Sequence, residues 1–364
     1  MIKIPFGASS KSFLGIDIGT ASIKIVELSK KGERKVLENY GEISTHEVGE
    51  MPFRTGFSPD RNSFSLSARE ISQGVGAILS EAKIHSRLAT FSIPDFSSFF
   101  TTIELPPMTR EELPRAVHFE ARQHIPLPLS EVVLDWSVIS KETAGPQNAP
   151  LKVILVAVPK EVINQYQEIG RLCSLELLAL EAEVFGLLRS LIKEDKKAII
   201  LVDIGAQSTT VSIVEDGVLK TSHSFDISGN DLSQSLSQSL QLDFWETEEI
   251  KKKHGLTAGA EVSFGQKPIS QILLPRVNLM VAEIEQISQN FYQKEGKEIE
   301  SIILAGGTAL LPGLREYLAS QLRKEVIIGD PFSEIVSPSI LTPVLKEIGP
   351  SYAIAVGMAL RGLE

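Results

Sequence analysis

Two short acidic segments contain the residues in this chain best suited to bind a charged ligand. The first reads Asp17-Ile-Gly19-Thr20 and is followed by Ser22 and Lys24, with apolar runs on both sides. This order predicts a β-hairpin whose turn holds a carboxylate, a glycine and hydroxyls. A glycine lets the backbone come close to a ligand, and the amides and hydroxyls beside it can hold phosphate oxygens. A carboxylate favours a phosphate only if a divalent cation or its water molecules lie between them.

The second segment repeats the first in the other half of the chain. Asp203, Gly205 and Ser208 reproduce the spacing of the first segment, and Thr209 follows directly. A single Asp-x-Gly turn is often an ordinary tight turn, so the repetition is what favours a binding function. Two similar hairpins predict two similar subdomains, whose turns face each other across a cleft and bind one polyphosphate from both sides.

A helix start and a charged helix follow the second segment. Gly229 stands before a polar helix that carries Asp231, so the backbone can approach an anion at the helix N-terminus. Glu248 and Lys251 are three residues apart and share one face of the next predicted helix. Either these two form a solvent-exposed ion pair, or they hold the ribose and base of a nucleotide.

A glycine pair follows a predicted buried strand, Ile302–Leu304, and the sequence there reads Gly306-Gly307-Thr308. Adjacent glycines let a flat group lie on the backbone. The alternative is a tight turn from the strand into a helix directly after Thr308.

An α/β fold with two lobes must position these segments, because 364 residues exceed what one compact core usually holds. The expected order is first lobe, inserted small α+β subdomain, first lobe again, second lobe, and a C-terminal helix that packs back on the first lobe. The corresponding ranges are 1–87, 88–158, 159–192, 198–349 (with a small subdomain around 243–290) and 350–364. Residues 1–12 are expected to form a loose lead-in and residues 47–65 a surface loop.

Composition excludes several functional classes. The net charge is −10, which makes the chain a poor general binder of nucleic acid or anionic lipid. With Cys173 as its single cysteine the chain cannot form an intrachain disulfide or a cysteine metal cluster. The sequence has no apolar run long enough to cross a membrane, and its N-terminus does not resemble a signal peptide. These features predict a cytoplasmic protein.

The order of the motifs resembles that of the actin-like ATPase superfamily, with its two lobes built on duplicated ribonuclease-H-like domains. The resemblance runs from about residue 13 to the end, and five unspecific motifs in a common order make it specific. Within the superfamily the chain most resembles the PilM family of type IV pilus assembly. The phrases that carry this resemblance are GIDIGTASIKIVEL, AVHFEARQHIPLPLSEVVLDW and LAGGTALLPGL. FtsA, the actin-like cell-division protein, is similar and shares the relocated small subdomain.

The resemblance implies that the chain binds ATP with Mg²⁺. Asp17 and Asp203 would contact the ion, through water, and the two turns would contact the phosphates. Gly229 and Asp231 would lie near the sugar and phosphates, and Glu248 and Lys251 would hold the ribose and adenine. The glycine pair would support the nucleoside. The residues implied for the nucleotide are Asp17, Gly19, Thr20, Ser22, Lys24, Asp203, Gly205, Ser208, Thr209, Gly229, Asp231, Glu248, Lys251, Gly306, Gly307 and Thr308.

Hydrolysis would need a group that positions a water molecule for in-line attack. Related proteins supply it from the helix that follows the connection in the first lobe, which makes Glu181 and Glu183 the candidates here. Both carboxylates could instead only favour the positive end of that helix. A nucleotide-bound scaffold with slow or no turnover fits equally well.

The resemblance leaves three functions to compare. A PilM-like scaffold would bind the short cytoplasmic N-terminal segment of PilN at the inner face of the membrane, with residues 88–158 as one wall of the groove. It could also bind other pilus motor and platform proteins or itself. An FtsA-like filament protein would carry an amphipathic membrane anchor, and Arg361-Gly-Leu-Glu does not resemble one. A small-molecule kinase of the same fold would need a catalytic carboxylate with a substrate pocket, and the sequence has no convincing pair.

Overall fold

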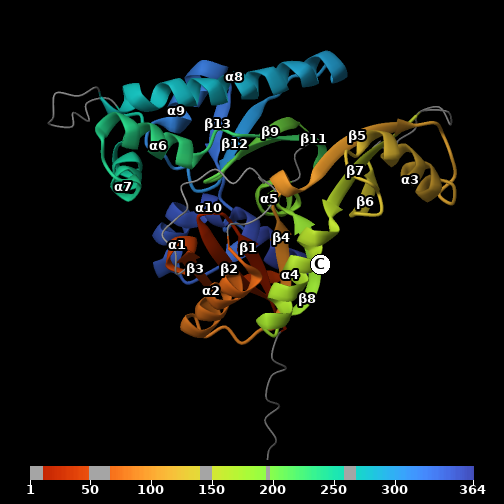
Figure 1. Ribbon diagram of the computed structural model, residues 1–364, viewed down its shortest axis with the longest axis horizontal. Helices are drawn as coiled ribbons and strands as arrows, with labels where there is room; N and C mark the ends of the chain where they lie inside the picture. Colours follow the sequence, from red (N-terminus) through yellow and green to blue (C-terminus); the bar gives the residue numbers. More distant parts are fainter. Residues whose placement is uncertain (1–10, 49–65, 140–149, 194–196, 258–267) are drawn as a thin grey trace, which may run out of the picture.

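The computed structural model describes residues 11–48, 66–139, 150–193, 197–257 and 268–364. These residues form two lobes and a smaller unit beside them (Figure 1). Most of the predicted lead-in and surface loop, residues 1–10 and 49–65, lies outside the described residues. In the part of the chain that the structure describes, no helix is long and apolar enough to cross a membrane.

The first lobe is built on a six-stranded sheet that contains the first predicted hairpin. β1 and β2 are antiparallel, with Asp17 opposite Lys24 at the turn end, and β4 lies parallel to β1. On one face of this sheet, alternate apolar residues pack against α2 (Ala68–Glu81) and α4 (Lys160–Leu172). The strands in spatial order are β14 (Ile335–Val336), β3 (Arg34–Ser44), β2 (Ser22–Lys31), β1 (Ser12–Ile18), β4 (Leu88–Ile93) and β8 (Glu176–Ala182).

The second lobe repeats this plan with a five-stranded sheet. β9 and β10 form the second predicted hairpin, with Asp203 opposite Thr210, and β12 lies parallel to β9. One face of the sheet packs against α6, α8 and α9. The strands in spatial order are β11 (Val218–Phe225), β10 (Thr209–Glu215), β9 (Ala198–Ile204), β12 (Ser301–Ala305) and β13 (Glu325–Ile328).

The inserted unit is smaller than the sequence predicts. Its sheet has the order β5 (Phe99–Leu105), β7 (Leu151–Pro159) and β6 (Val132–Val138), and α3 covers one face with its buried residues. The predicted range began at residue 88, but β4 lies between β1 and β8 in the first sheet. Assigning β4 to the inserted unit was therefore wrong, because a parallel strand finds its partners far away in the chain.

Helices enclose the two large sheets and separate them. α5 and α10 lie between the sheets, since residues of both helices share one core with β9 and β10; α10 also packs on β2. The helices are α1 (Thr45–Val48), α2 (Ala68–Glu81), α3 (Leu113–His124), α4 (Lys160–Leu172), α5 (Glu183–Leu191), α6 (Gly229–Leu240), α7 (Phe244–His254), α8 (Ile269–Glu295), α9 (Leu314–Leu322) and α10 (Thr342–Arg361).

Two helix starts differ from the prediction. α10 begins at Thr342, before the predicted start at residue 350. α9 begins only at Leu314, so the residues after Thr308 form turns rather than an immediate helix. The small residues of α10 do allow the predicted close packing, because a Cβ added to Gly357 would lie 2.0 Å from the carbonyl oxygen of Gly186 in α5.

Candidate functional site

The two acidic turns have the same local geometry. The N–H of Gly19 donates to the carbonyl oxygen of Ser22 over 3.0 Å, and the N–H of Gly205 donates to that of Ser208 over the same distance. Each hydrogen bond closes a tight turn directly after a strand whose next-to-last residue is an aspartate. The predicted repetition is therefore a repetition of structure as well as of sequence.

Asp17 is buried at the end of β1, with 5% of its surface exposed. Ser92, at the same level of the neighbouring strand β4, donates a 2.8 Å hydrogen bond from its hydroxyl to Asp17 Oδ1. Burial raises the pKa of Asp17, although Lys24 and the Ser92 hydrogen bond act in the opposite direction. The Lys24 ammonium, itself buried, donates to the Ser22 hydroxyl at 2.6 Å and lies 3.4 Å from Glu42.

Asp203 occupies the matching place in the second lobe. Burial and the negative charge of Asp17 raise its pKa to about 7, with Lys24 opposing them. Gly306 lies directly against it, with φ +86, and a Cβ there would come 2.5 Å from Asp203 Oδ1. Only glycine suits this position, because any side chain would be strained and would collide with the carboxylate.

Glu183 and Asp95 complete a group of four carboxylates between the lobes, which we call the central carboxylate cluster (Asp17, Asp95, Glu183 and Asp203). The main-chain N–H of Asp95 donates to Glu183 Oε2 at 3.1 Å, and the N–H of Val184 donates to Asp95 Oδ1 at 3.4 Å. Burial, followed by the negative charges of the other three members, raises the pKa of Glu183 well above its ordinary value. Burial likewise raises the pKa of Asp95 to about 8.

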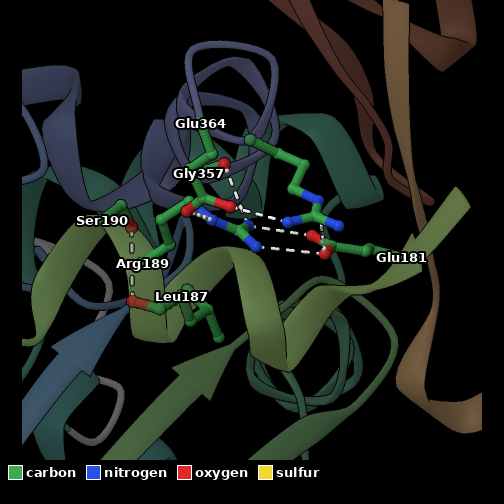
Figure 2. Close-up of polar contacts among 7 residues, drawn as sticks. Glu181, Leu187, Arg189, Ser190, Gly357 and Glu364 are labelled. Carbon is green, nitrogen blue, oxygen red and sulfur yellow. Dashed lines mark hydrogen bonds and ion pairs between the residues drawn. The ribbon is translucent and has the colours of Figure 1, made fainter. Parts of the chain in front are cut away.

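Glu181 does not join this cluster. It receives two hydrogen bonds from the guanidinium of Arg189, at 2.8 and 3.0 Å, and lies 3.3 Å from Arg361. Arg189 also bonds Glu364 and the carbonyl oxygen of Gly357, so the group joins α5 to the end of α10 (Figure 2). Of the two glutamates proposed from the sequence, the structure therefore places Glu183 among the site carboxylates and Glu181 in a structural ion-pair network.

The charged pair of α7 is not the solvent-exposed pair of the alternative prediction, since Lys251 is buried and Glu248 is partly buried. Lys251 keeps 4% of its surface exposed and donates to Glu248 Oε2 at 2.6 Å and to the Gly229 carbonyl oxygen at 2.8 Å. Ser233 donates to the same Glu248 oxygen at 2.5 Å. Burial lowers the pKa of Lys251, against the raising effect of Glu248. The pair therefore ties α7 to the start of α6.

The start of α6 connects this pair to the second turn. The N–H of Gly229 donates to the carbonyl oxygen of Gly205 at 2.9 Å. Asp231 forms a capping box with Ser228, accepting from the N–H and hydroxyl of that residue. Thr209 is fully buried and donates from its hydroxyl to the main chain of Ile227. Asp231 and Thr209 therefore hold the shape of the site in the structure.

The remaining predicted residues also gather around the two turns. The carbonyl oxygen of Thr20 accepts from the Thr45 hydroxyl at 2.8 Å. The N–H of Thr308 donates to the carbonyl oxygen of Ile204 at 3.2 Å, next to Gly205, and its neighbour Gly307 is exposed. The residues of both lobes that were predicted from the sequence therefore lie around a single site.

The site suits a hydrated cation with a phosphate better than a bare metal ion. Within the described ranges, no group of three or more His, Cys, Asp or Glu side chains is arranged to hold a metal ion directly. Mg²⁺ commonly keeps several water ligands and shares its coordination with phosphate oxygens. A buried carboxylate oxygen without a hydrogen-bond partner, Asp95 Oδ2, is also available in the cluster.

A comparison with known families decides the classification. The model of the family described as type IV pilus assembly protein PilM matches residues 15–363. The chain belongs to the PilM family. Its two-lobed architecture is the actin-like fold of that family.

Solved structures and curated relatives agree with this assignment. A PilM-PilN type IV pilus biogenesis complex has a TM-score of 0.81 at 24% identity, covering 96% of this chain and 98% of that one. MreB 5 of Spiroplasma citri bound to AMPPNP has a TM-score of 0.52 at 14% identity, covering 97% and 96%. The cell-division protein FtsA of Pseudomonas aeruginosa is 24% identical over 98% of this chain and 90% of its own length. FtsA of Staphylococcus epidermidis is 21% identical over 58% of this chain and 49% of its own length.

Two residues beside the site of this PilM-family chain, Ser92 and Asp95, were not predicted from the sequence. Ser92 and Asp95 lie at and just after the end of β4, and both are buried. A usable signal was present, because polar residues at the carboxyl end of a strand parallel to β1 are expected beside Asp17. The assignment of β4 to the inserted unit hid that signal.

Proposed function

We propose that this chain is an ATP-binding scaffold of type IV pilus assembly. Asp17 and Asp203 precede matching tight turns in opposite lobes, and the negative charge of Asp17 raises the pKa of Asp203; this arrangement carries the proposal. Removing a carboxylate from water is costly, so a fold that keeps four together, two of them buried and two partly buried, has a reason to do so. A cationic ligand between the lobes would supply that reason.

Asp17 and Asp203 would hold a hydrated Mg²⁺, whose charge would offset that of the triphosphate. The main-chain amides of the two turns would bind phosphate oxygens, and Gly306 would allow the nucleoside to approach the backbone. The pair Glu248–Lys251 would present its remaining hydrogen-bonding capacity to the sugar and base. Structures of MreB 5 bound to AMPPNP and ADP support a nucleotide in this fold.

Glu183 is the residue proposed to act on an attacking water. Burial and the neighbouring carboxylates raise its pKa, and a bound cation would lower that pKa and favour the ionised form. Hydrolysis would then depend on the bound cation and be slow at most. This expectation suits a scaffold whose nucleotide stabilises one arrangement of the lobes.

Calorimetry of the full chain with ATP tests the nucleotide site. Asp203→Ala is expected to weaken Mg·ATP binding at least tenfold without unfolding the protein, because it removes one side of the cation site. Asp135→Ala, an exposed aspartate of β6, serves as the matched control and should bind as the unmodified chain does. Equal affinity of all three proteins would refute the assignment.

The proposed partner is the cytoplasmic N-terminal segment of PilN, which would recruit the chain to the inner face of the membrane and join it to the assembly machinery. The PilM-PilN complex among the similar structures supports this partner. The inserted unit would contribute a wall of the binding surface. It contacts the second lobe as well as the first, through a 2.8 Å ion pair between Lys152 and Glu295, so its position could respond to the nucleotide.

One surface of the inserted unit is a candidate for part of that contact. The exposed face of α3 forms an open depression of about 470 Å³ around Phe119, which is 64% exposed. Arg115 and Arg122 flank it, and neither forms an ion pair with a residue that the structure describes. An exposed aromatic side chain beside unpaired arginines is typical of a protein contact.

A synthetic peptide of the PilN N-terminal segment tests the partner. Fluorescence anisotropy with ATP and Mg²⁺ present should show binding to the full chain, and Phe119→Ala should weaken it if α3 takes part. Tyr292→Ala, an exposed aromatic on α8, is the control. Undetectable binding at high micromolar concentration would refute PilN as the partner, whereas unchanged binding by Phe119→Ala would remove only α3 from the contact.

A further inference from the structure

One side-chain oxygen of Asp95 caps the first turn of α5, but neither core packing nor this capping explains the environment of the other, Oδ2. The residue follows β4 in a short 3-10 turn and is 96% removed from solvent, with 4% of its surface exposed. Its Oδ2 atom is buried and has no hydrogen-bond partner among the residues that the structure describes. Leaving a buried acceptor unsatisfied costs free energy, so such atoms in native proteins commonly await a ligand or serve a function.

Asp95 holds the first turn of α5 by two hydrogen bonds, one from its main chain to Glu183 and one from Val184 to its side chain. The N–H of Asp95 donates to Glu183 Oε2, while Asp95 Oδ1 accepts from the N–H of Val184, the next residue of α5. This reciprocal pair joins the end of β4 to the first turn of α5. The orientation of the Glu183 carboxylate therefore depends on Asp95, which lies in a different element and 88 residues away in the chain.

The two lobes repeat the same sheet plan, and Asp95 of the first lobe is equivalent in position to a residue of the proposed nucleotide site in the second lobe. In the first sheet Ile16 pairs with Phe91, and in the second sheet the equivalent Val202 pairs with Leu304. Asp95 stands four positions after Phe91, and Thr308 stands four positions after Leu304. Strand register therefore makes Asp95 the first-lobe counterpart of Thr308.

We propose that Asp95 is a positioning residue of the nucleotide site, which orients Glu183 and offers Oδ2 to a water molecule of a hydrated divalent cation. The inference rests on the proposed nucleotide function. A carboxylate suits this place only when a cation compensates its charge, whereas the threonine hydroxyl of the second lobe can meet a phosphate directly. At these equivalent positions the first lobe would contact the cation and the second lobe the phosphate. Cation contacts would therefore be concentrated on the first lobe.

The test measures the ATP affinity of the full chain with Mg²⁺ and with EDTA, by calorimetry, for the unmodified chain and Asp95→Asn. The variant should lose about tenfold in affinity with Mg²⁺, as is usual when an outer partner of a metal site is removed. With EDTA its affinity should stay equal or increase, because one negative charge near the triphosphate is gone. A merely structural role would lower both affinities together.

Asp95→Thr, which copies the second-lobe residue, covers the case in which Asp95→Asn does not fold, and should show the same separation of the two affinities. Ser98→Ala, which removes a hydroxyl bonded to Pro94 in the same turn, is the control and should change neither. Equal affinities of Asp95→Asn, Asp95→Thr and the unmodified chain with Mg²⁺, or an equal loss under both conditions, would overturn the proposal. Absence of ATP binding by the unmodified chain would instead refute the nucleotide function.

A double variant tests the link to Glu183. If Asp95 acts partly through that residue, combining Asp95→Asn with Glu183→Gln should weaken Mg·ATP binding by clearly less than the product of the two single effects. Multiplicative losses would show that the two residues act independently and would overturn the positioning role.

Discussion

Asp203→Asn should stabilise the protein in the absence of nucleotide, although Asp203 belongs to the proposed ligand site. The pKa of Asp203 is raised from 3.8 to about 7, first by burial and then by Asp17. A group with a raised pKa in the folded state binds protons more tightly there than in the unfolded chain. The free energy of unfolding therefore falls as the pH rises from about 4 to 7 and levels off above 7.

The size of this effect follows from the shift of about three pKa units. Each unit corresponds to about 1.4 kcal/mol, so the ionised carboxylate costs up to about 4 kcal/mol at pH 8 and about 2 kcal/mol at pH 5.5. These are upper figures, because the half-buried side chain keeps some contact with solvent. Removing the charge should thus stabilise the fold by about 2 kcal/mol more at pH 8 than at pH 5.5.

Urea denaturation with EDTA at the two pH values measures this difference, since the linear extrapolation gives the free energy of unfolding. Asp135→Asn is the matched control, because this exposed aspartate undergoes the same chemical change, and it should alter the stability by less than about 0.5 kcal/mol. A stabilisation by Asp203→Asn that does not grow with pH, or a destabilisation at both pH values, would refute the argument that burial and Asp17 strain this carboxylate.

Three further predictions concern the elements around the site. Lys251→Ala should lower the free energy of unfolding by about 2 kcal/mol in urea denaturation, because it removes the hydrogen bonds of a buried ammonium to Glu248 and Gly229 and leaves only the exposed Lys252 beside Glu248; a loss below about 1 kcal/mol would contradict the burial of Lys251. Gly357→Ala should cost at least about 2 kcal/mol in the same assay, since the new Cβ would overlap the main chain of α5, and unchanged stability would be inconsistent with that packing. His46→Ala should speed nucleotide release about two- to tenfold in a stopped-flow chase, because the rings of His46 and Trp245 lie 4.5 Å apart and join α1 of the first lobe to α7 of the second; an unchanged release rate would show that this contact does not hold the lobes together.

The sequence by itself determined the local features of the site. The spacing of Asp17 and Gly19, repeated at Asp203 and Gly205, predicted both hairpins and their pairing as halves of one site, and the structure has matching turns at both places. Such features were predictable because a hairpin turn depends on a few neighbouring residues with special backbone or side-chain chemistry. The helix face shared by Glu248 and Lys251 was predictable for the same reason, although its burial was not.

Only the tertiary structure decided which distant residues join these turns. β4 pairs in parallel with β1 and with β8, both far away in the chain. The first pairing brings Ser92 to Asp17, and the second brings Asp95 to Glu183. The choice between Glu181 and Glu183 was equally non-local, because Arg189 and Arg361 bind the former from α5 and α10. Parallel pairing and ion-pair partners depend on where helices return to the sheet, and no spacing within a short segment records that.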